Sequence, residues 1–183
     1  MLTALHQPST MYADEDEARH TAELELLAAT IWRAITTRDT EMLLRHVRPE
    51  LADDARQQLV MPRSGLSCAL FDTECLQGRL SPEALIRTSV VDFFRSQPNA
   101  RLRIKYLGQA MFGLESPFDL AMLTWVVPGS EADQKFPAHD LRRWGIDHVN
   151  TCVIHTKATG WRFHSRAGVF FCGGSLLLNP DAR

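Results

Sequence analysis

The sequence predicts an α+β fold, in which helices from the first half of the chain pack on one face of an antiparallel sheet built from the second half. Two observations predict it. Before Pro98 the apolar residues mostly recur at helical spacing, whereas from Arg101 they alternate with polar residues as they do in strands. The expected strands follow one another through tight connections, which favours antiparallel pairing.

Three helices are expected. The first runs from about Thr21 to Thr37 and has one apolar face. Asp39 can cap a short second helix that ends at Pro49. The third begins at Ser81-Pro82-Glu83, which combines a capping hydroxyl, a proline at the first helical position and an acid in the first turn. It ends before Pro98, because proline disfavours helix in the residue that precedes it.

Strands are expected around residues 102–106, 120–127, 147–157 and 161–171. The second of these is apolar on both faces, which predicts a central position in the sheet. A polar insertion over residues 128–145 separates it from the third. Within residues 50–80, QQLVMP and LSCALF are predicted as two further short strands joined by the turn PRSG.

Composition limits the function classes. The chain has 183 residues, which predicts one domain over residues 21–172, with a flexible arm over 1–20 and a tail over 173–183. The net charge of −2 gives no basic surface for nucleic acid or for a membrane. Four cysteines without CxxC or zinc spacing are expected to be reduced and mostly buried, and the N-terminus lacks a signal segment, so we expect a cytoplasmic protein.

Three segments in order carry a family resemblance. They are IWRAITTRDTEMLLRHVRPEL at 31–51, LSPEALIRTSVVDFF at 80–94, and the final pair IDHVNTCVIH and GWRFHSRAG at 146–155 and 160–168. Together they resemble the nuclear transport factor 2-like superfamily, which includes ketosteroid isomerase, scytalone dehydratase, limonene epoxide hydrolase and SnoaL-type polyketide cyclases. The resemblance implies a cone-shaped domain with a strongly curved sheet around a cavity, and a homodimer.

For function, the resemblance implies an isomerase, cyclase or dehydratase of secondary metabolism. It would act without cofactor or metal, by acid/base chemistry, on a small apolar carbonyl compound of the polyketide or terpenoid type. The alternative is a non-catalytic module of the same fold that binds a small molecule or another protein. Two departures prevent a direct transfer of activity: Ile31 and Trp32 stand where ketosteroid isomerase has its tyrosine, and Ile35 and Thr36 replace the Tyr and Asp of scytalone dehydratase.

Asp147 and His148 are the first candidates for catalysis. The segment 146–148 resembles the one that supplies an oxyanion-hole aspartic acid in ketosteroid isomerase, and scytalone dehydratase has a catalytic histidine at the start of the same strand. In an apolar cavity the pKa of Asp147 would rise, so that it could hold or donate a proton. The alternative is a loop-end carboxylate that caps its own backbone. His148 should point to the opposite face, because side chains alternate along a strand.

Tyr106 aligns with the other catalytic histidine of scytalone dehydratase and is either a pocket hydroxyl or the edge of the core. Trp32, Trp125 and His155 are the candidate substrate-binding residues, although Trp32 and Trp125 also suit plain core packing and His155 also suits a core or rim position. His46 is expected at the surface or rim. His148 and His155 lack the spacing of a compact metal site, so no metal is expected.

Overall fold

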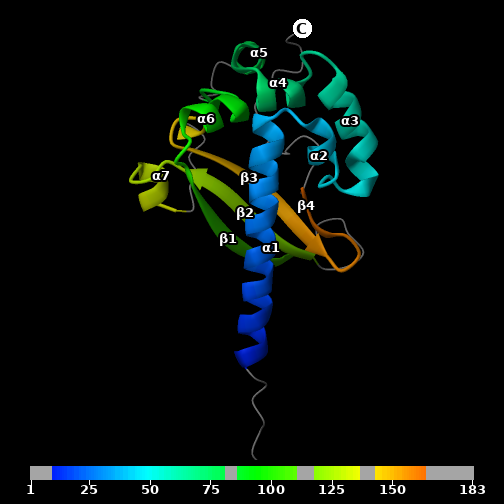
Figure 1. Ribbon diagram of the computed structural model, residues 1–183, viewed down its shortest axis with the longest axis vertical. Helices are drawn as coiled ribbons and strands as arrows, with labels where there is room; N and C mark the ends of the chain where they lie inside the picture. Colours follow the sequence, from blue (N-terminus) through cyan, green and yellow to red (C-terminus); the bar gives the residue numbers. More distant parts are fainter. Residues whose placement is uncertain (1–9, 81–85, 111–117, 137–142, 164–183) are drawn as a thin grey trace, which may run out of the picture.

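The computed structural model of the chain describes residues 10–80, 86–110, 118–136 and 143–163. Four strands form one antiparallel sheet in the order β1-β2-β3-β4. They are β1 (Arg101–Ala110), β2 (Phe118–Val126), β3 (His148–Thr156) and β4 (Gly160–Phe163). The order is a simple meander, and helices lie over one face of the sheet (Figure 1). The predicted α+β class with antiparallel strands is therefore confirmed, and the described strands form an open sheet.

Helix α1 (Thr10–Thr36) crosses the helix-covered face of the sheet (Figure 1). It begins earlier than expected, so residues 10–20 belong to a helix and not to a loose arm. One stripe of α1 is buried at helical spacing and forms part of the core: Leu24, Leu27, Ala28, Ile31, Ala34 and Ile35. Among the described residues, no helix is both long enough and apolar enough to cross a membrane.

Aromatic rings fill the space between α1, the sheet and α6 (Val90–Ser96). The ring of Trp32 stacks on Phe94 with centroids 3.9 Å apart, and Phe94 meets Trp125 edge-on at 5.3 Å. Phe94 and Trp125 are almost fully buried, and Trp32 packs against the same core. These contacts match the core-packing alternative for Trp32 and Trp125, because the two indoles are separated by a phenylalanine ring and not by open space.

Residues 50–80 form mainly short helices, so the predicted hairpin is wrong. The structure has α2 (Thr40–Leu44), a 3₁₀ turn at Pro49–Leu51, then α3 (Ala52–Val60), α4 (Gly65–Phe71) and α5 (Thr73–Arg79). Side chains start each of three helices: Asp39 accepts from the amide of Met42, Ser64 from Ser67 and Asp72 from Cys75. The Asp39 cap was predicted, whereas the other two were overlooked in favour of the apolar runs that follow them.

The third predicted helix begins later than expected. Residues 81–85, which carry the expected start signal, lie outside the described residues, while Ile86 to Ser89 are not helical and α6 begins at Val90. The polar insertion contains the short helix α7 (Glu131–Gln134). Strands β1, β2 and β3 lie at or near the predicted positions.

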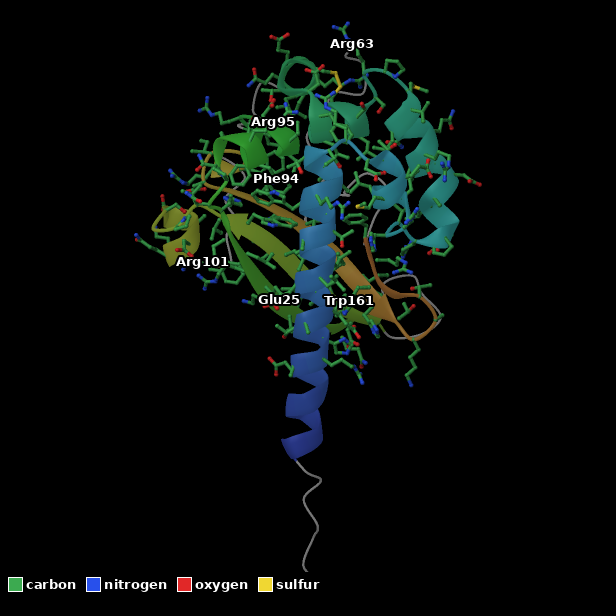
Figure 2. The ribbon with its side chains drawn as sticks, in the orientation of Figure 1. Glu25, Arg63, Phe94, Arg95, Arg101 and Trp161 are labelled. Carbon is green, nitrogen blue, oxygen red and sulfur yellow. A yellow bond between two sulfur atoms is a disulfide. The ribbon has the colours of Figure 1, made fainter. Side chains whose placement is uncertain are left out.

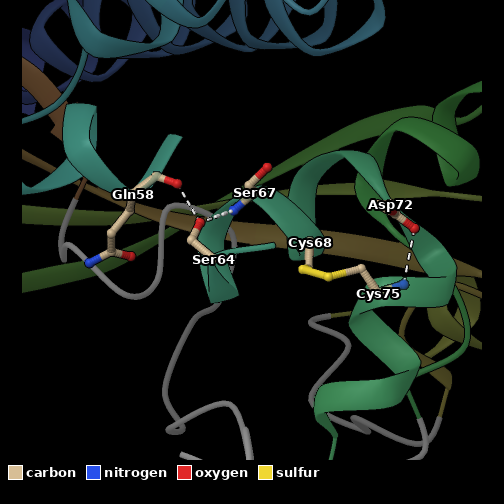
Figure 3. Close-up of a disulfide and its surroundings, with 6 residues drawn as sticks. All are labelled: Gln58, Ser64, Ser67, Cys68, Asp72 and Cys75. Carbon is tan, nitrogen blue, oxygen red and sulfur yellow. Dashed lines mark hydrogen bonds between the residues drawn. A yellow bond between two sulfur atoms is a disulfide. The ribbon is translucent and has the colours of Figure 1, made fainter. Parts of the chain in front are cut away.

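A disulfide bond joins Cys68 of α4 to Cys75 of α5 (Figure 3). The two cysteines are seven positions apart, so the bond clamps two consecutive short helices across the turn at Asp72. Cys152 is disulfide-bonded as well. The expectation of reduced thiols is therefore wrong, because the turn that Asp72 forms places two cysteines of neighbouring helices within bonding distance. The cytoplasmic location stays a prediction.

Strand β1 contains a bulge next to Tyr106. Tyr106 pairs with Ala121 and Gly108 pairs with Leu120, so the intervening Leu107 has no partner on β2. Leu107 is 41% exposed, and Gly108 has a φ of +88°, a conformation that glycine adopts at little cost. The bulge shifts the pairing of β1 with β2 in its second half.

We expect the Cys68–Cys75 bond to contribute about 2.5 kcal/mol, the chain-entropy value for so short a loop. The double variant Cys68→Ser/Cys75→Ser should therefore have a free energy of unfolding lower than that of wild type by about this amount, measured by urea unfolding. Non-reducing mass spectrometry gives the direct check, because trypsin cuts after Arg63 and Arg79 and leaves both cysteines in one peptide. A mass lower than that of the dithiol by two hydrogen atoms confirms the bond; a dithiol mass in oxidised protein contradicts it.

Candidate functional site

The residues singled out from the sequence fall into three separate places. Asp147 and His148 lie at the start of β3, next to the end of β2. His155 lies near the far end of β3, where it pairs with Asp119 of β2. The distance from His148 to His155 along the strand is about 25 Å. Tyr106 is on β1 toward the same end as His155. Trp32 and Trp125 belong to the aromatic core, and Trp125 pairs with Val149 near the start of β3.

Asp147 is the centre of a buried ion pair. Its carboxylate accepts a hydrogen bond from Nε of Arg143 at 2.5 Å and contacts Nδ1 of His148 at 2.9 Å. Only 3% of Asp147 and 1% of His148 are exposed. Arg143 also lies 3.7 Å from Glu131 of α7, so one guanidinium bridges a buried and an exposed carboxylate. Both partners of the carboxylate among the described residues are side chains, so this geometry differs from the backbone cap considered for Asp147.

The ion pair keeps Asp147 ionised. Burial by itself raises the pKa of the carboxyl, but the hydrogen bonds from His148 and Arg143 and the charge of Arg143 hold the pKa below its usual value. The expected rise in pKa is therefore wrong, because the polar insertion supplies a cation that the sequence reasoning did not pair with Asp147. An ionised carboxylate on Nδ1 can orient the His148 ring, and it cannot donate a proton.

The turn before β3 depends on Gly145. Its φ is +76°, and a Cβ there would lie 2.9 Å from both Cγ2 and the backbone nitrogen of Thr88. The amide of Gly145 donates to the carbonyl of His148 at 2.8 Å, and the amide of Asp147 donates to Arg143 at 3.2 Å. A glycine is required where this tight turn packs against the segment that precedes α6.

Tyr106 and His155 come together at the other end of the sheet, beside α1. The His155 ring lies 4.7 Å from His20 of α1 and 5.2 Å from Trp161 of β4, measured between centroids. His20 is 5.5 Å from Trp161, and Tyr106 is 6.3 Å from it. Figure 2 shows Trp161 beside α1, with α1 crossing the strands at this point. Four aromatic side chains from one helix and three strands therefore form one cluster.

Charged groups surround this cluster. Nδ1 of His20 is 3.5 Å from the Glu23 carboxylate, and Nδ1 of His155 is 3.9 Å from that of Asp119. Burial and the neighbouring His20 lower the pKa of His155, against the pull of Glu23 and Asp119. Burial raises the pKa of the Tyr106 hydroxyl, and the nearby carboxylates add to the rise. His155 is therefore a neutral base at neutral pH, and Tyr106 stays protonated.

A pocket of about 320 Å³ opens next to the cluster, between α1, β3 and β4. Leu26, Leu27 and Trp161 give it apolar walls, and Glu23, His46, His155 and Arg162 are its ionisable lining residues. Burial lowers the pKa of His46, and the charges of Arg162 and Arg45 lower it further. Nδ1 of His46 is buried and has no hydrogen-bond partner in the part of the chain that the structure describes. This pocket thus combines apolar surface with two neutral imidazoles.

A larger hollow of about 770 Å³ lies at the α4–α5 end of the molecule. Several of its polar groups are engaged in structural contacts. Thr73 donates to Asp92 at 2.5 Å and Ser89 donates to the same carboxylate at 3.0 Å, which ties α5 to α6. The Arg38 guanidinium lies over the Phe71 ring and donates a hydrogen bond to the backbone carbonyl of Phe71 at 3.2 Å. Because Thr73, Asp92 and Arg38 already have partners, and because the pocket beside His155 combines two imidazoles with apolar walls, that pocket is the better candidate site.

Sequence reasoning missed His20, Glu23, Trp161 and Arg162. The signal was present for the first two, because residues three apart on a helix share a face and HTAE has that spacing. It was overlooked because His20 was assigned to the arm before the first helix. His46 was expected at the surface or rim and does line the pocket, whereas Trp161 and Arg162 carry no pattern that distinguishes them from other strand residues.

Comparison of the chain with protein-family models, with curated proteins and with solved structures finds no match.

We expect Gly145→Ala to destabilise the protein more than Gly129→Ala. Both glycines have positive φ, so each substitution carries a backbone penalty of about 1–2 kcal/mol. Only at Gly145 does the new Cβ meet neighbouring atoms, which adds about 1–3 kcal/mol for overpacking. Urea unfolding of the two variants measures the difference, and equal losses would show that Thr88 does not restrict this turn.

Asp147→Asn should lower the free energy of unfolding at neutral pH by about 1.5–3 kcal/mol, the range for hydrogen bonds that involve a charged group. Because the folded-state pKa of Asp147 is depressed, its contribution is present above the unfolded pKa of about 3.9 and is lost as pH falls through the folded value. The variant should therefore lose less stability on acidification than wild type. Urea unfolding across this pH range measures both effects, with the exposed Asp53→Asn as control. Parallel pH profiles for wild type and Asp147→Asn contradict the ion pair.

Proposed function

We propose that this chain is an isomerase, cyclase or dehydratase that acts by acid/base chemistry on a small, largely apolar carbonyl compound. The substrate, of the polyketide or terpenoid type, would bind in the pocket between α1, β3 and β4. One observation carries the proposal: His46, His155 and Arg162 reach the same pocket from three separate segments of the chain. Convergent ionisable groups with apolar walls are typical of such sites.

The reaction class follows from the chemistry of these side chains. A neutral imidazole accepts a proton from the carbon next to a carbonyl group, and the electron pair moves to the carbonyl oxygen to give an enolate. The guanidinium of Arg162 stabilises that negative charge. Return of the proton to another carbon completes an isomerisation. In a dehydration, the protonated imidazole instead gives its proton to the β-hydroxyl group, which leaves as water while the enolate electrons form the new carbon–carbon double bond. The histidines that line the pocket, rather than Asp147, are therefore the proposed bases.

A second candidate function is a non-catalytic binding module. Leu26 favours it, because this leucine lines the pocket and is 71% exposed, as expected for a residue that another molecule covers. The two candidates differ in what they require of the histidines. A binding module needs their shape, whereas the enzyme needs a ring nitrogen that accepts a proton.

Proton exchange into deuterated buffer tests the enzyme without knowledge of the natural substrate. We expect wild type to accelerate loss of the α-proton NMR signals of cyclohexanone and 2-decalone beyond the rate in buffer. His46→Gln or His155→Gln should remove most of the acceleration, by about 10²-fold for the residue that acts as base. Arg95→Gln, an exposed change on α6, serves as control and should keep the wild-type rate. Ligand-induced shifts without exchange would contradict the enzyme and support the binding module.

A further inference from the structure

His20, Glu23 and His155 place three ligand atoms together. His20 and Glu23 are three residues apart on α1 and therefore share a face, and β3 brings His155 underneath them. One nitrogen or oxygen from each lies within 4.8 Å of the other two. The His20–Glu23 pair is already at 3.5 Å. Ligand atoms bound to one tetrahedral zinc ion are about 3.4 Å apart, as bond lengths near 2.1 Å require.

His20 has a nitrogen that the rest of the fold does not satisfy. Its Nδ1 is buried and has no hydrogen-bond partner among the described residues, although the Glu23 carboxylate is near. A histidine packed only for its aromatic surface would leave such an atom at a cost, because buried polar groups normally have partners. The ring is held between His155 and Trp161, so this nitrogen has a fixed position.

We propose that His20, Glu23 and His155 bind a divalent transition-metal ion, with Zn²⁺ as the ion of first choice. Two imidazoles and one carboxylate are suitable ligands for it, and three protein ligands leave a position open toward the adjoining pocket. The Asp119 carboxylate, 3.9 Å from Nδ1 of His155, is placed to orient that ring as an outer partner. The set combines a helix and a strand that are far apart in the sequence, which explains why spacing alone did not indicate a metal.

The ion would refine the proposed reaction. A metal at the pocket wall polarises a carbonyl oxygen and makes the neighbouring proton easier to remove. His155 would then hold the ion, and His46, which lines the same pocket, would be the base. This catalytic role depends on the proposed function, whereas binding of the ion does not.

Calorimetric titration of the chelator-treated full-length chain with Zn²⁺ tests the site. We expect one equivalent to bind, and each of His20→Gln, Glu23→Gln and His155→Gln to lower the affinity by at least about 100-fold, as loss of a direct ligand should cost more than loss of an outer partner. His46→Gln is the matched control, because it changes a pocket histidine outside the ligand set, and it should keep the wild-type affinity. Absence of zinc binding, or wild-type affinity in His20→Gln, overturns the proposal.

Cobalt provides a second measurement on the same variants. Co²⁺ in a tetrahedral nitrogen and oxygen site gives visible absorption bands, which should appear with wild type and with His46→Gln and be absent in Glu23→Gln. The two proposals fail separately. Zinc binding without proton exchange supports the site and contradicts the enzyme, whereas proton exchange in a protein that binds no zinc supports the enzyme and contradicts the metal site. Proton exchange at an unchanged rate after removal of bound zinc contradicts only the catalytic role of the ion.

Discussion

The packing of α1 against the sheet is the contact on which the rest of the molecule depends. The strands form an open meander, so their inner face needs a cover, and α1 provides it with a continuous buried stripe from Leu24 to Ile35. Burial of apolar area at about 25 cal/mol per Å² makes such a stripe a main source of stability. Helix α1 also extends on the N-terminal side of this stripe. The same packing therefore brings His20 and Glu23 over the end of β3.

The two polar sites differ in how they relate to this core. Arg143, Asp147 and His148 are close in sequence, and a local turn makes their ion pair. His20 and His155 are far apart in sequence and meet only when α1 packs on the sheet. The first arrangement explains how a strand can begin with an acid and a histidine inside the protein: the charge is neutralised by a neighbour four residues away.

The sequence predicted those parts of the fold that periodicity and caps encode. The alternation around Ile104, the apolar run of β2 and the Asp39 cap each led to the correct element. The helices between residues 50 and 80 were missed, because short apolar runs are ambiguous between strand and buried helix, and the caps at Ser64 and Asp72 decide the matter. For the site, the sequence singled out His155, which lines the candidate pocket, and Tyr106, which lies in the aromatic cluster beside it. The pKa of Asp147 depends on its pairing with Arg143, a contact that was not considered.

The bulge at Leu107 affects whether strand β1 can pair with a strand of another molecule. Among the described strands β1 is an outer one, so its free backbone groups could template a strand from another molecule and start aggregation. The extra residue twists this strand locally, and Arg101 and Lys105 place exposed positive charge along it. A second copy would meet an irregular and charged border there. Growth of a continuous sheet across β1 is therefore opposed.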